Sequence, residues 1–435
     1  MRTFDGRLVR WGKRAELVEL QMVDSSLDFR KQQHALLAIL GLGLILRLVW
    51  AALIPIDPLS DSVAYQTFAE NIINHGVYGW EPDKPGAYWA VGTSALLAAG
   101  YHVFGMHSWV VIGLNLSASL LSIIILFNLG NRYFGRPSGM FAALLFALWP
   151  LTIQYTTIIA SELFFICFVL IGLYFWERAK STTYTVLWLL AAGAAFAGAS
   201  YIRPIALLLP IFLTLFEVLR GETRILNSLL RMLLVLVTIG VLIAPWSYRN
   251  YQVFGKPVMI STNFGANFWM GNNPNTSGGY QPLPDRLDGL SETEKSDILL
   301  GEAKEFISEN PTAFLKRTAL KAVQMHNRET IGAHWNKTQI LSKWGETGFK
   351  ISKIVPTVYW YAMLALALAG LVAFVRANGF WAMLLCTPVM IWGYVTSLHS
   401  IIVVSDRYHS PSIPFICLIA SYALATLYNS RRRTG

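Results

Sequence analysis

Long apolar stretches separated by short polar segments recur along most of the chain. Most approach the roughly 20 residues that a helix needs to cross a hydrocarbon layer about 30 Å thick. Strand-like alternation of apolar and polar residues does not recur, so the pattern predicts membrane-spanning helices rather than a barrel. Ten spans are predicted, at residues 35–54, 108–130, 138–157, 162–177, 184–200, 204–219, 229–247, 356–375, 379–400 and 410–428.

A further apolar stretch, residues 87–105, is ambiguous because it is short and contains Gly92, Gly100 and His102. If it crossed the membrane, every later loop would change sides. The short basic loops all face the cytoplasm only if it does not cross, as the positive-inside rule requires. We therefore predict a juxtamembrane or re-entrant helix here, with both termini cytoplasmic. The basic residues concerned are Arg132, Arg136, Arg178, Lys180, Arg220, Arg224, Arg231, Arg376, Arg431, Arg432 and Arg433.

This topology divides the chain into four parts. They are a basic cytoplasmic arm (1–34), an N-terminal transmembrane module (35–247) with an external loop at 55–107, a long external loop (248–355), and C-terminal helices with a basic tail (356–435). Within the long loop, residues 292–329 have helical periodicity that is broken at Asn310-Pro311.

Composition supports a polytopic membrane protein. Hydrophobic residues make up 54% of the 435 residues, and the mean hydropathy is +0.46, too apolar for a soluble domain with one core. The net charge of +10 comes largely from Lys and Arg beside apolar stretches. We therefore expect lipid, and no nucleic acid, as a partner. Cys167, Cys386 and Cys417 lie inside apolar stretches and are expected to be core residues.

The predicted topology gathers four polar turns on the external side. These are the loop with Asp57 and Asp61, the Ser161-Glu162 turn, the turn at 201–204, and the turn at 405–409. Asp61 is a candidate general base, although spacing alone favours a helix N-cap. Glu162 is a candidate acceptor-binding or catalytic acid, or a first-turn complement to a helix dipole.

Several cations are predicted at the same depth. Lys84, Arg203, Arg249 and Arg407 could bind the phosphate of a lipid headgroup, while Lys84 alone could equally be a snorkelling side chain. Asp57, Asp61 and Glu162 are the only candidate metal ligands, so a divalent metal is left open. No glycine-rich nucleotide loop is present in the sequence, and no cofactor is required.

Residues 244–280 are rich in Asn, Gly and aromatic residues, which suit either tight turns or stacking and hydrogen bonding to a sugar. The candidate substrate-binding residues there and in the other external turns are Asp57, Tyr65, Tyr88, Trp89, Asn250, Asn267, Trp269, Asn272, Tyr408 and His409.

Several short motifs in this order resemble a known family. They are Asp61 with Tyr65 and Ala69, then DKPGAYW, NRYFGRPSG, ASELFF, PWSYRN, NFGANFWMGNNP and RYHSPSIP. The chain from about residue 36 to 425 is similar to bacterial polyprenyl-phosphate-sugar-dependent glycosyltransferases of the GT-C fold, relatives of the protein O-mannosyltransferases and the lipid A aminoarabinose transferase. It differs in having Asp61-Ser62 where the family commonly has Asp-Glu.

The resemblance implies an all-α GT-C fold in a bacterial inner membrane, with the active site facing the periplasm. It implies a sugar donor carried on polyprenyl (undecaprenyl) phosphate. By motif position, Asp61 is the catalytic carboxylate, Glu162 the acidic residue heading a span, and Lys84 the phosphate contact. Arg249 and Arg407 fall in motifs of the bacterial members.

Together these features give the hypothesis of an inverting transfer of a sugar to a hydroxyl of a glycolipid, polysaccharide or protein, with Asp61 as base. Two alternatives remain at this point. One is an enzyme like an O-antigen ligase or polymerase, and the other is a lipid-sugar flippase or transporter, whose charges should line a path through the bundle.

The topology predicts which loops a membrane-impermeant thiol reagent can reach. In a variant without the three native cysteines, single cysteines at residues 131–137 should not be labelled in intact cells. Cysteines in the 248–355 loop should be labelled under the same conditions. Labelling of 131–137 from outside would show that residues 87–105 cross the membrane.

Overall fold

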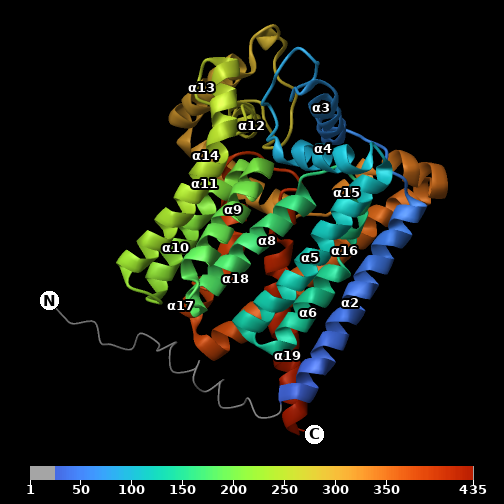
Figure 1. Ribbon diagram of the computed structural model, residues 1–435, viewed down its shortest axis with the longest axis vertical. Coiled ribbons are helices and arrows are strands. Elements are labelled where there is room, and N and C mark those ends of the chain that lie inside the picture. Colours follow the sequence, from blue (N-terminus) through green and yellow to red (C-terminus); the bar gives the residue numbers. More distant parts are fainter. Residues whose placement is uncertain (1–24, 435) are drawn as a thin grey trace, which may run out of the picture.

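The computed structural model describes residues 25–434, and this part of the chain is almost entirely helical (Figure 1). It contains no β-strand, and its isolated bridge joins Glu81 and Lys84. The all-α class predicted from the sequence is therefore confirmed. Residues 1–24 of the predicted basic arm lie outside the described residues, and helix α2 begins at Ser25, inside that predicted arm.

The N-terminal module contains the helices up to Phe254. They are α2 (Ser25–Leu53), α3 (Asp61–His75), α4 (Gly92–Phe104), α5 (Ser108–Phe134), α6 (Arg136–Ala147), α7 (Pro150–Gln154), η1 (Tyr155–Thr157), α8 (Glu162–Arg178), η2 (Ala179–Ser181), α9 (Thr185–Ile202), η3 (Pro204–Leu208), α10 (Leu209–Arg220) and α11 (Ile225–Phe254).

The rest of the chain adds a polar layer and a C-terminal group of helices. The layer contains α12 (Phe264–Gly271), η4 (Asp285–Leu287), α13 (Glu292–Glu309), α14 (Pro311–Met325) and α15 (Ile331–Trp335). The C-terminal group contains α16 (Lys337–Asn378), α17 (Phe380–Leu384), α18 (Thr387–Ile401), η5 (Ser410–Ser412) and α19 (Ile413–Thr434).

Helices occupy all ten predicted spans, but their lengths differ. Six helices in the described part of the chain are long and apolar enough to cross a membrane, or seven if the bent pair α6 and α7 forms one span. Helices α8, α10 and α18, with 17, 12 and 15 residues, are shorter. The count of ten crossings therefore stays a prediction.

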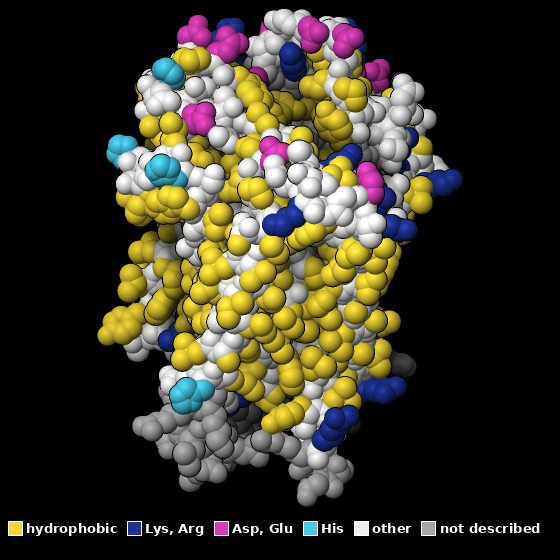
Figure 2. Space-filling view, turned by 90° about the vertical axis from the view of Figure 1, so that its right-hand side faces the viewer, with side chains coloured by type: hydrophobic (Ala, Val, Ile, Leu, Met, Phe, Trp, Pro, Cys, Tyr) yellow, Lys and Arg dark blue, Asp and Glu magenta, His cyan; other side chains and the backbone are white. Residues whose placement is uncertain are grey.

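The surface matches a protein that lies in a bilayer. On the face seen in Figure 2, hydrophobic side chains form a broad band across the middle, and most Asp and Glu lie toward one end. The start of α2 and the end of α19 lie at the opposite end of the bundle, away from α3, α12 and α13 (Figure 1). Because water is absent from the hydrocarbon layer, helices satisfy their own backbone groups across such a band.

Helix α4 is the ambiguous stretch at 87–105. Its 13 residues span about 20 Å at 1.5 Å per residue, less than a bilayer core. In Figure 1 it lies across the ends of the long helices rather than along them. Gly92, at its start, approaches the backbone of Tyr201 so closely that a Cβ would lie 2.6 Å from the Tyr201 carbonyl.

The span predicted at 138–157 is occupied by a bent pair of helices rather than by one straight helix. Helices α6 and α7 meet at a 51° bend, where Pro150 lacks the N–H that a continuing helix needs. Arg47 of α2 is fully buried beside the break. Its Nη1 donates to the Ala147 carbonyl at 3.0 Å and its Nη2 to the Thr152 hydroxyl at 2.8 Å, so a cation caps the end of α6.

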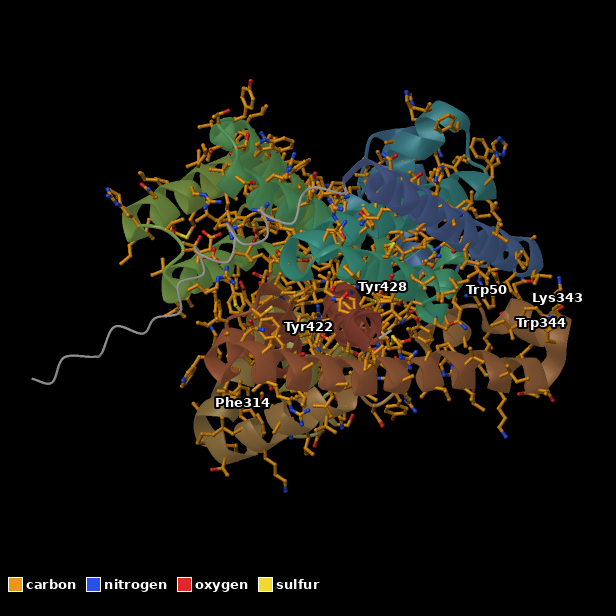
Figure 3. All side chains as sticks on the ribbon, turned by 90° about the horizontal axis from the view of Figure 1, so that it is seen from below. Trp50, Phe314, Lys343, Trp344, Tyr422 and Tyr428 are labelled. Carbon is orange, nitrogen blue, oxygen red and sulfur yellow. The ribbon has the colours of Figure 1, made fainter. Side chains whose placement is uncertain are left out.

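The C-terminal helices are part of the same core. In the view of Figure 3, α19, with Tyr422 and Tyr428, lies between the N-terminal helices and α16, and most of its residues from Ile413 to Ala425 are buried. The start of α16 meets the end of α2 through Trp50 and Trp344, whose ring centroids are 6.1 Å apart (Figure 3). The two modules therefore form one packed unit.

The polar layer contains the helical segment predicted in the long loop. Helix α13 begins with a capping box between Ser291 and Glu294. It ends at Glu309, and α14 begins at Pro311, so the predicted break at Asn310-Pro311 is confirmed. Helix α11 continues to Phe254 and α16 begins at Lys337, so the predicted loop boundaries at 248 and 355 lie inside helices.

A close contact ties this layer to the end of α18. A Cβ on Gly271 would lie 1.8 Å from the carbonyl oxygen of Ile402. The buried Lys321 crosses the same junction, and its ammonium lies 3.3 Å from the Gly271 carbonyl and 3.0 Å from that of Ile401. Burial lowers the pKa of Lys321 to about 8. The segment that follows α18 is thus fixed by its contacts with α12 and α14.

The Gly271 contact can be tested by adding a single methyl group. Gly271→Ala should force α12 away from Ile402 and lower stability by about 1–3 kcal/mol, the usual cost of overpacking. Thermal unfolding of the purified protein in detergent would measure this. Gly301→Ala is the matched control, because open space surrounds Gly301 in α13, and it should be neutral or stabilising by up to about 1 kcal/mol. Equal melting temperatures for both variants would contradict the close contact.

Candidate active site

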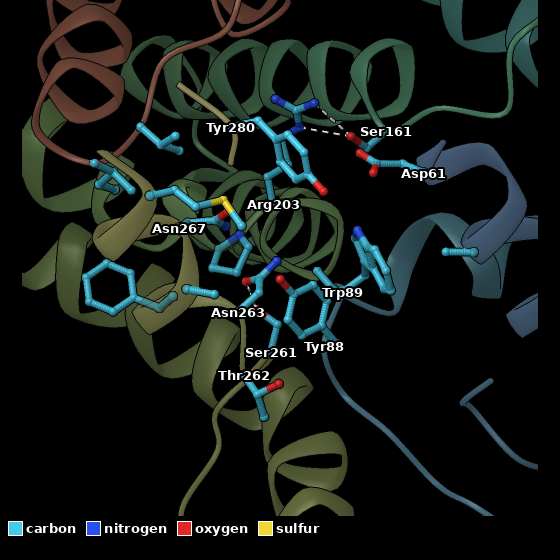
Figure 4. A pocket seen from close by; sticks show the side chains of 18 of the residues that line it. Asp61, Tyr88, Trp89, Ser161, Arg203, Ser261, Thr262, Asn263, Asn267 and Tyr280 are labelled. Carbon is cyan, nitrogen blue, oxygen red and sulfur yellow. Dashed lines mark hydrogen bonds between the residues drawn. The ribbon is translucent and has the colours of Figure 1, made fainter. Parts of the chain in front are cut away.

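The four polar turns predicted to lie together do meet, around one cavity of about 970 Å³. Each turn contributes lining residues, which include Asp61, Ser161, Arg203, Arg407 and Tyr408. Residues of α12, α13 and the segment before them close the other side. Figure 4 shows Asp61, Ser161 and Arg203 at one end of this cavity and Ser261, Thr262 and Asn263 toward the other.

Asp61 faces a cation rather than the end of its own helix. It is the first residue of α3, and Ser60, at the N-cap position, makes no side-chain capping bond. The Asp61 carboxylate instead lies 2.7 Å from Nη1 of Arg407. The interpretation of Asp61 as an N-cap was therefore wrong. Both side chains retain about a fifth of their exposure, 20% and 18%, so the pair remains accessible from the cavity.

The backbone just before Asp61 is unusual. Ser60 has φ 58° and ψ −127°, and within the described residues it is the single non-glycine residue with positive φ. Such conformations are costly and persist where the surrounding structure imposes them. Ser60 also lines the cavity. The strain therefore lies at the point where the chain turns to direct Asp61 at Arg407.

Aromatic rings surround Arg407. Its guanidinium carbon lies 4.9 Å from the ring centroid of Trp335 and 5.3 Å from that of Tyr408. Burial alone would lower the pKa of Arg407, but the nearby Asp61 carboxylate raises it well above its usual value. The guanidinium is therefore a permanent positive charge in a partly desolvated site, where its interactions with anions are strengthened.

A second acid-base pair lies beside the first. Arg203 donates to the Glu162 carboxylate at 2.5 Å, and its Nε and Nη2 lie 2.9 and 2.8 Å from the Ser161 hydroxyl. Glu162 is 1% exposed and lies behind Arg203, which lines the cavity. Glu162 is thus the counter-ion that fixes Arg203, and Arg203 is the member of the pair that a ligand would contact.

The Ser161-Glu162 turn is itself held by α5. The buried Asn115 amide donates to the carbonyls of Tyr155, Thr156 and Ile158, at 3.0 to 3.2 Å. These carbonyls lie in and just after η1, where the chain leaves regular helix. One side chain thus satisfies an irregular segment inside the bundle and fixes the start of α8.

The opposite wall of the cavity is aromatic and amide-rich. It includes Tyr88, Trp89, Asn263, Asn267 and Tyr280, several of which are visible in Figure 4. Burial, reinforced by Asp61, raises the pKa of Tyr88 to about 12, so its hydroxyl keeps its proton at neutral pH. Tyr65 also lines the cavity. These groups can stack on a sugar ring and hydrogen-bond to its hydroxyls.

Two of the predicted phosphate-binding cations lie outside the lining of this cavity. Lys84 is exposed and pairs with Glu81 at 2.6 Å. Arg249 donates to the carbonyls of Gly86 and Tyr78 at 2.7 and 3.3 Å and stacks on Trp246. Arg249 therefore holds the loop at 78–86, while Arg203 and Arg407 are the cations that face the cavity.

Five predicted substrate-binding residues also lie outside the lining. Asp57 is half-buried before α3. Asn250 donates to the Val258 carbonyl, Trp269 to Glu302, and Asn272 to the Ile401 carbonyl. His409 is fully buried and contacts Glu329. The last four hold backbone or neighbouring side chains together rather than presenting groups to the cavity.

Sequence reasoning missed Trp335, Asn263, Tyr280 and the buried Glu329. Asn263 and Tyr280 belong to the Asn-rich stretch that was singled out, so that signal could have found them. Trp335 ends the short helix α15 and Glu329 precedes that helix, with no motif around either residue, and only the fold brings them to the 405–409 turn. In the described part of the chain, no three His, Cys, Asp or Glu side chains are arranged to hold a metal ion.

The comparison with family models finds one match within the N-terminal module. Residues 84–248 match the model described as dolichyl-phosphate-mannose-protein mannosyltransferase. The matched segment includes α4 to α9, the Ser161-Glu162 turn and Arg203. No curated protein sequence matches the chain.

The solved structures match over nearly the whole chain. ArnT from Cupriavidus metallidurans bound to undecaprenyl phosphate has a TM-score of 0.59 at 14% identity, covering 89% of this chain and 60% of its own. The oligosaccharyltransferase of Archaeoglobus fulgidus in its apo form has a TM-score of 0.59 at 13% identity, covering 94% and 52%. The chain therefore has the GT-C fold. This confirms the fold that the motifs predicted.

A third match shares the same fold. Archaeal AglB from Archaeoglobus fulgidus, in complex with an inhibitory peptide and a dolichol-phosphate, has a TM-score of 0.55 at 12% identity, covering 93% of this chain and 51% of its own. The chain described here thus spans about half to three fifths of the length of these three structures.

The geometry makes a prediction for Glu162. Glu162→Gln keeps the size of the side chain but removes the charge opposite Arg203, and should lower stability by about 1–3 kcal/mol, the range for a buried charge-assisted hydrogen bond. Thermal unfolding in detergent measures the effect. Glu309→Gln, at an exposed carboxylate that ends α13, is the control and should be neutral. An unchanged melting temperature for Glu162→Gln would show that Arg203 does not depend on this partner.

Proposed function

We propose that the chain is an integral-membrane glycosyltransferase that moves a sugar from a polyprenyl-phosphate donor to an acceptor hydroxyl. The observation that carries this proposal is the Asp61–Arg407 pair, a carboxylate and a cation 2.7 Å apart and facing one large cavity. The matched family and the polyprenyl phosphates bound in two matched structures support the same chemistry. The donor carries its own activating phosphate, so no nucleotide site is needed.

The donor phosphate would bind between Arg203 and Arg407. Both guanidiniums line the cavity, and each is fixed by a carboxylate or a hydroxyl and by aromatic neighbours. Guanidinium groups form strong, bidentate hydrogen bonds with phosphate oxygens. They would also stabilise the negative charge that develops on the leaving phosphate, which is often the largest contribution to catalysis. The polyprenyl chain would extend along the apolar band of the bundle.

Asp61 would act as the general base. Its carboxylate accepts the proton of the acceptor hydroxyl while the acceptor oxygen attacks C1 of the sugar. The C1–O bond to phosphate breaks, and the polyprenyl phosphate leaves with the bonding electron pair. A single displacement of this kind inverts the configuration at C1. A donor phosphate would also compete with Asp61 for Arg407, which would release the carboxylate for the acceptor.

The wall formed by Tyr88, Trp89, Asn263, Asn267 and Tyr280 would receive the sugar. Aromatic faces and amide groups bind sugars through stacking and directional hydrogen bonds. The distribution of basic loops supports an external position for this cavity and cytoplasmic termini, and the family resemblance supports the periplasmic side of a bacterial inner membrane. Glycolipid, polysaccharide and protein hydroxyls are all candidate acceptors.

The test is to incubate the purified protein with a panel of polyprenyl-phosphate sugars and acceptors and to read product masses with and without a chelator. Asp61→Asn should lower turnover by about 10²–10⁴-fold, the usual contribution of a general base. Full turnover by this variant would contradict the role of Asp61. Lipid transfer across a reconstituted bilayer without any glycosylated product would instead support a transporter.

The same assay separates the cations inside the cavity from those outside it. Arg407→Ala should abolish turnover or raise the donor KM strongly. Lys84→Ala is the matched control, since Lys84 is exposed and pairs only locally with Glu81, and it should remain close to wild type. The reverse result would place the phosphate near Lys84 rather than at Arg407.

A further inference from the structure

The segment 329–335, between α14 and α16, makes hydrogen bonds to the turn that contains Arg407. Thr330 donates to the Asp406 carboxylate through its backbone N–H at 3.1 Å and its hydroxyl at 2.6 Å. Glu329 lies 3.0 Å from His409. Contacts from this one segment therefore fix Asp406 and His409, which lie on either side of Arg407 in the sequence. Trp335, from the same segment, lies against the guanidinium itself.

The Glu329–His409 contact is a fully buried acid-base pair, with both side chains 0% exposed. The Trp149 indole N–H donates to both Glu329 oxygens, at 3.0 and 3.1 Å. His409 Nδ1 lies 2.7 Å from the Met325 carbonyl, which makes Nδ1 a donor. Its ring stacks on Trp360 with centroids 4.1 Å apart. The pair is thus held on every side by the bundle.

The chemistry of this pair makes it a rigid connection. Because Nδ1 donates to a carbonyl, Nε2 and the Glu329 oxygen must share one proton, so the pair is neutral overall in either form. Burial raises the pKa of Glu329, although hydrogen bonding to His409 opposes the shift. A buried acid of this kind is costly unless all its hydrogen bonds are made. Its partners here, Trp149 and His409, come from opposite modules of the chain.

We propose that Glu329 is a positioning residue for Arg407, which it directs at Asp61 and the donor phosphate by locking His409 to Trp149. Glu329 does not line the cavity, and its side chain reaches the 405–409 turn through His409. This inference rests on the proposed function, in which Arg407 binds the phosphate. It adds a residue that no motif in the sequence identifies.

Two substitutions of Glu329 separate geometry from charge. In Glu329→Gln the amide N–H donates to His409 Nε2 while the amide oxygen accepts from Trp149, so both connections are retained. In Glu329→Ala both are lost, and a cavity forms beside the turn. We therefore expect the glutamine variant to bind phosphate as wild type does. The alanine variant should bind phosphate more weakly, because Arg407 is no longer held in place.

The experiment measures the Kd of undecaprenyl phosphate for the purified full chain. Glu329→Ala should raise this Kd by about tenfold, the effect of losing one well-placed hydrogen bond, and Glu329→Gln should stay within about threefold. The double variant Glu329→Ala/Arg407→Ala should bind no more weakly than Arg407→Ala alone, because two substitutions that act through one contact are not additive. Glu309→Ala, at an exposed carboxylate, is the control.

Hydrogen exchange of the peptide 403–412 gives a readout that does not depend on any ligand. It should quicken in Glu329→Ala and not in Glu329→Gln, while exchange in α5 and α8 stays unchanged. If Glu329→Ala does not fold, Thr330→Val removes only the hydroxyl bond to Asp406 and should shift both readouts in the same direction by less.

Three results would overturn the inference. The first is a double variant whose fold increase in Kd is the product of the two single fold increases. The second is an equal increase in Kd in Glu329→Ala and Glu329→Gln. The third is an unchanged hydrogen-exchange rate of peptide 403–412 in Glu329→Ala. Failure of the wild-type protein to bind undecaprenyl phosphate would count against the proposed function instead. In that case the exchange measurement would still decide whether Glu329 holds the turn.

Discussion

The ion pair between Asp61 and Arg407 is the contact on which the arrangement of the site depends. It joins the first turn of α3 to the turn after α18, and thereby connects the N-terminal module with the C-terminal helices across the large cavity. An exposed pair of this kind contributes little free energy. This one is shielded by Trp335 and Tyr408 and held by strained or clamped backbone on both sides. Its importance lies in fixing where two opposite charges face a ligand.

The structure surrounds this pair with contacts that leave it little freedom. Arg203 is held by Glu162, the start of α8 by Asn115, and the end of α18 by Gly271 and Lys321. Most of these groups are buried polar side chains with their hydrogen bonds made, which specify one geometry more strictly than apolar packing does. The fold thus places several of its costly interior polar groups around the cavity.

The sequence predicted the elements set by hydropathy and local chemistry. The helical spans, the break at Asn310-Pro311 and the meeting of four distant turns follow from apolar lengths, proline and the distribution of Arg and Lys. It could not predict side-chain partners, because these depend on tertiary contacts. Spacing alone therefore favoured an N-cap role for Asp61 beside its role as a candidate base. Lys84 was grouped with Arg203 and Arg407, which line the cavity while Lys84 does not. The sequence gives no sign of the roles of Glu329 and Trp335, because they lie far along the chain from the turn that they contact.

The distance along the chain between the two partners of the central ion pair has a consequence for biogenesis. A membrane protein is synthesised and inserted from its N-terminus onward. Glu162 meets Arg203 within the same module, so that pair can close as soon as α9 is in place. The Asp61–Arg407 pair, in contrast, can form only after almost the whole polypeptide has been synthesised. Nascent chains stalled before α18 would therefore hold the N-terminal module with the Asp61 carboxylate not yet neutralised.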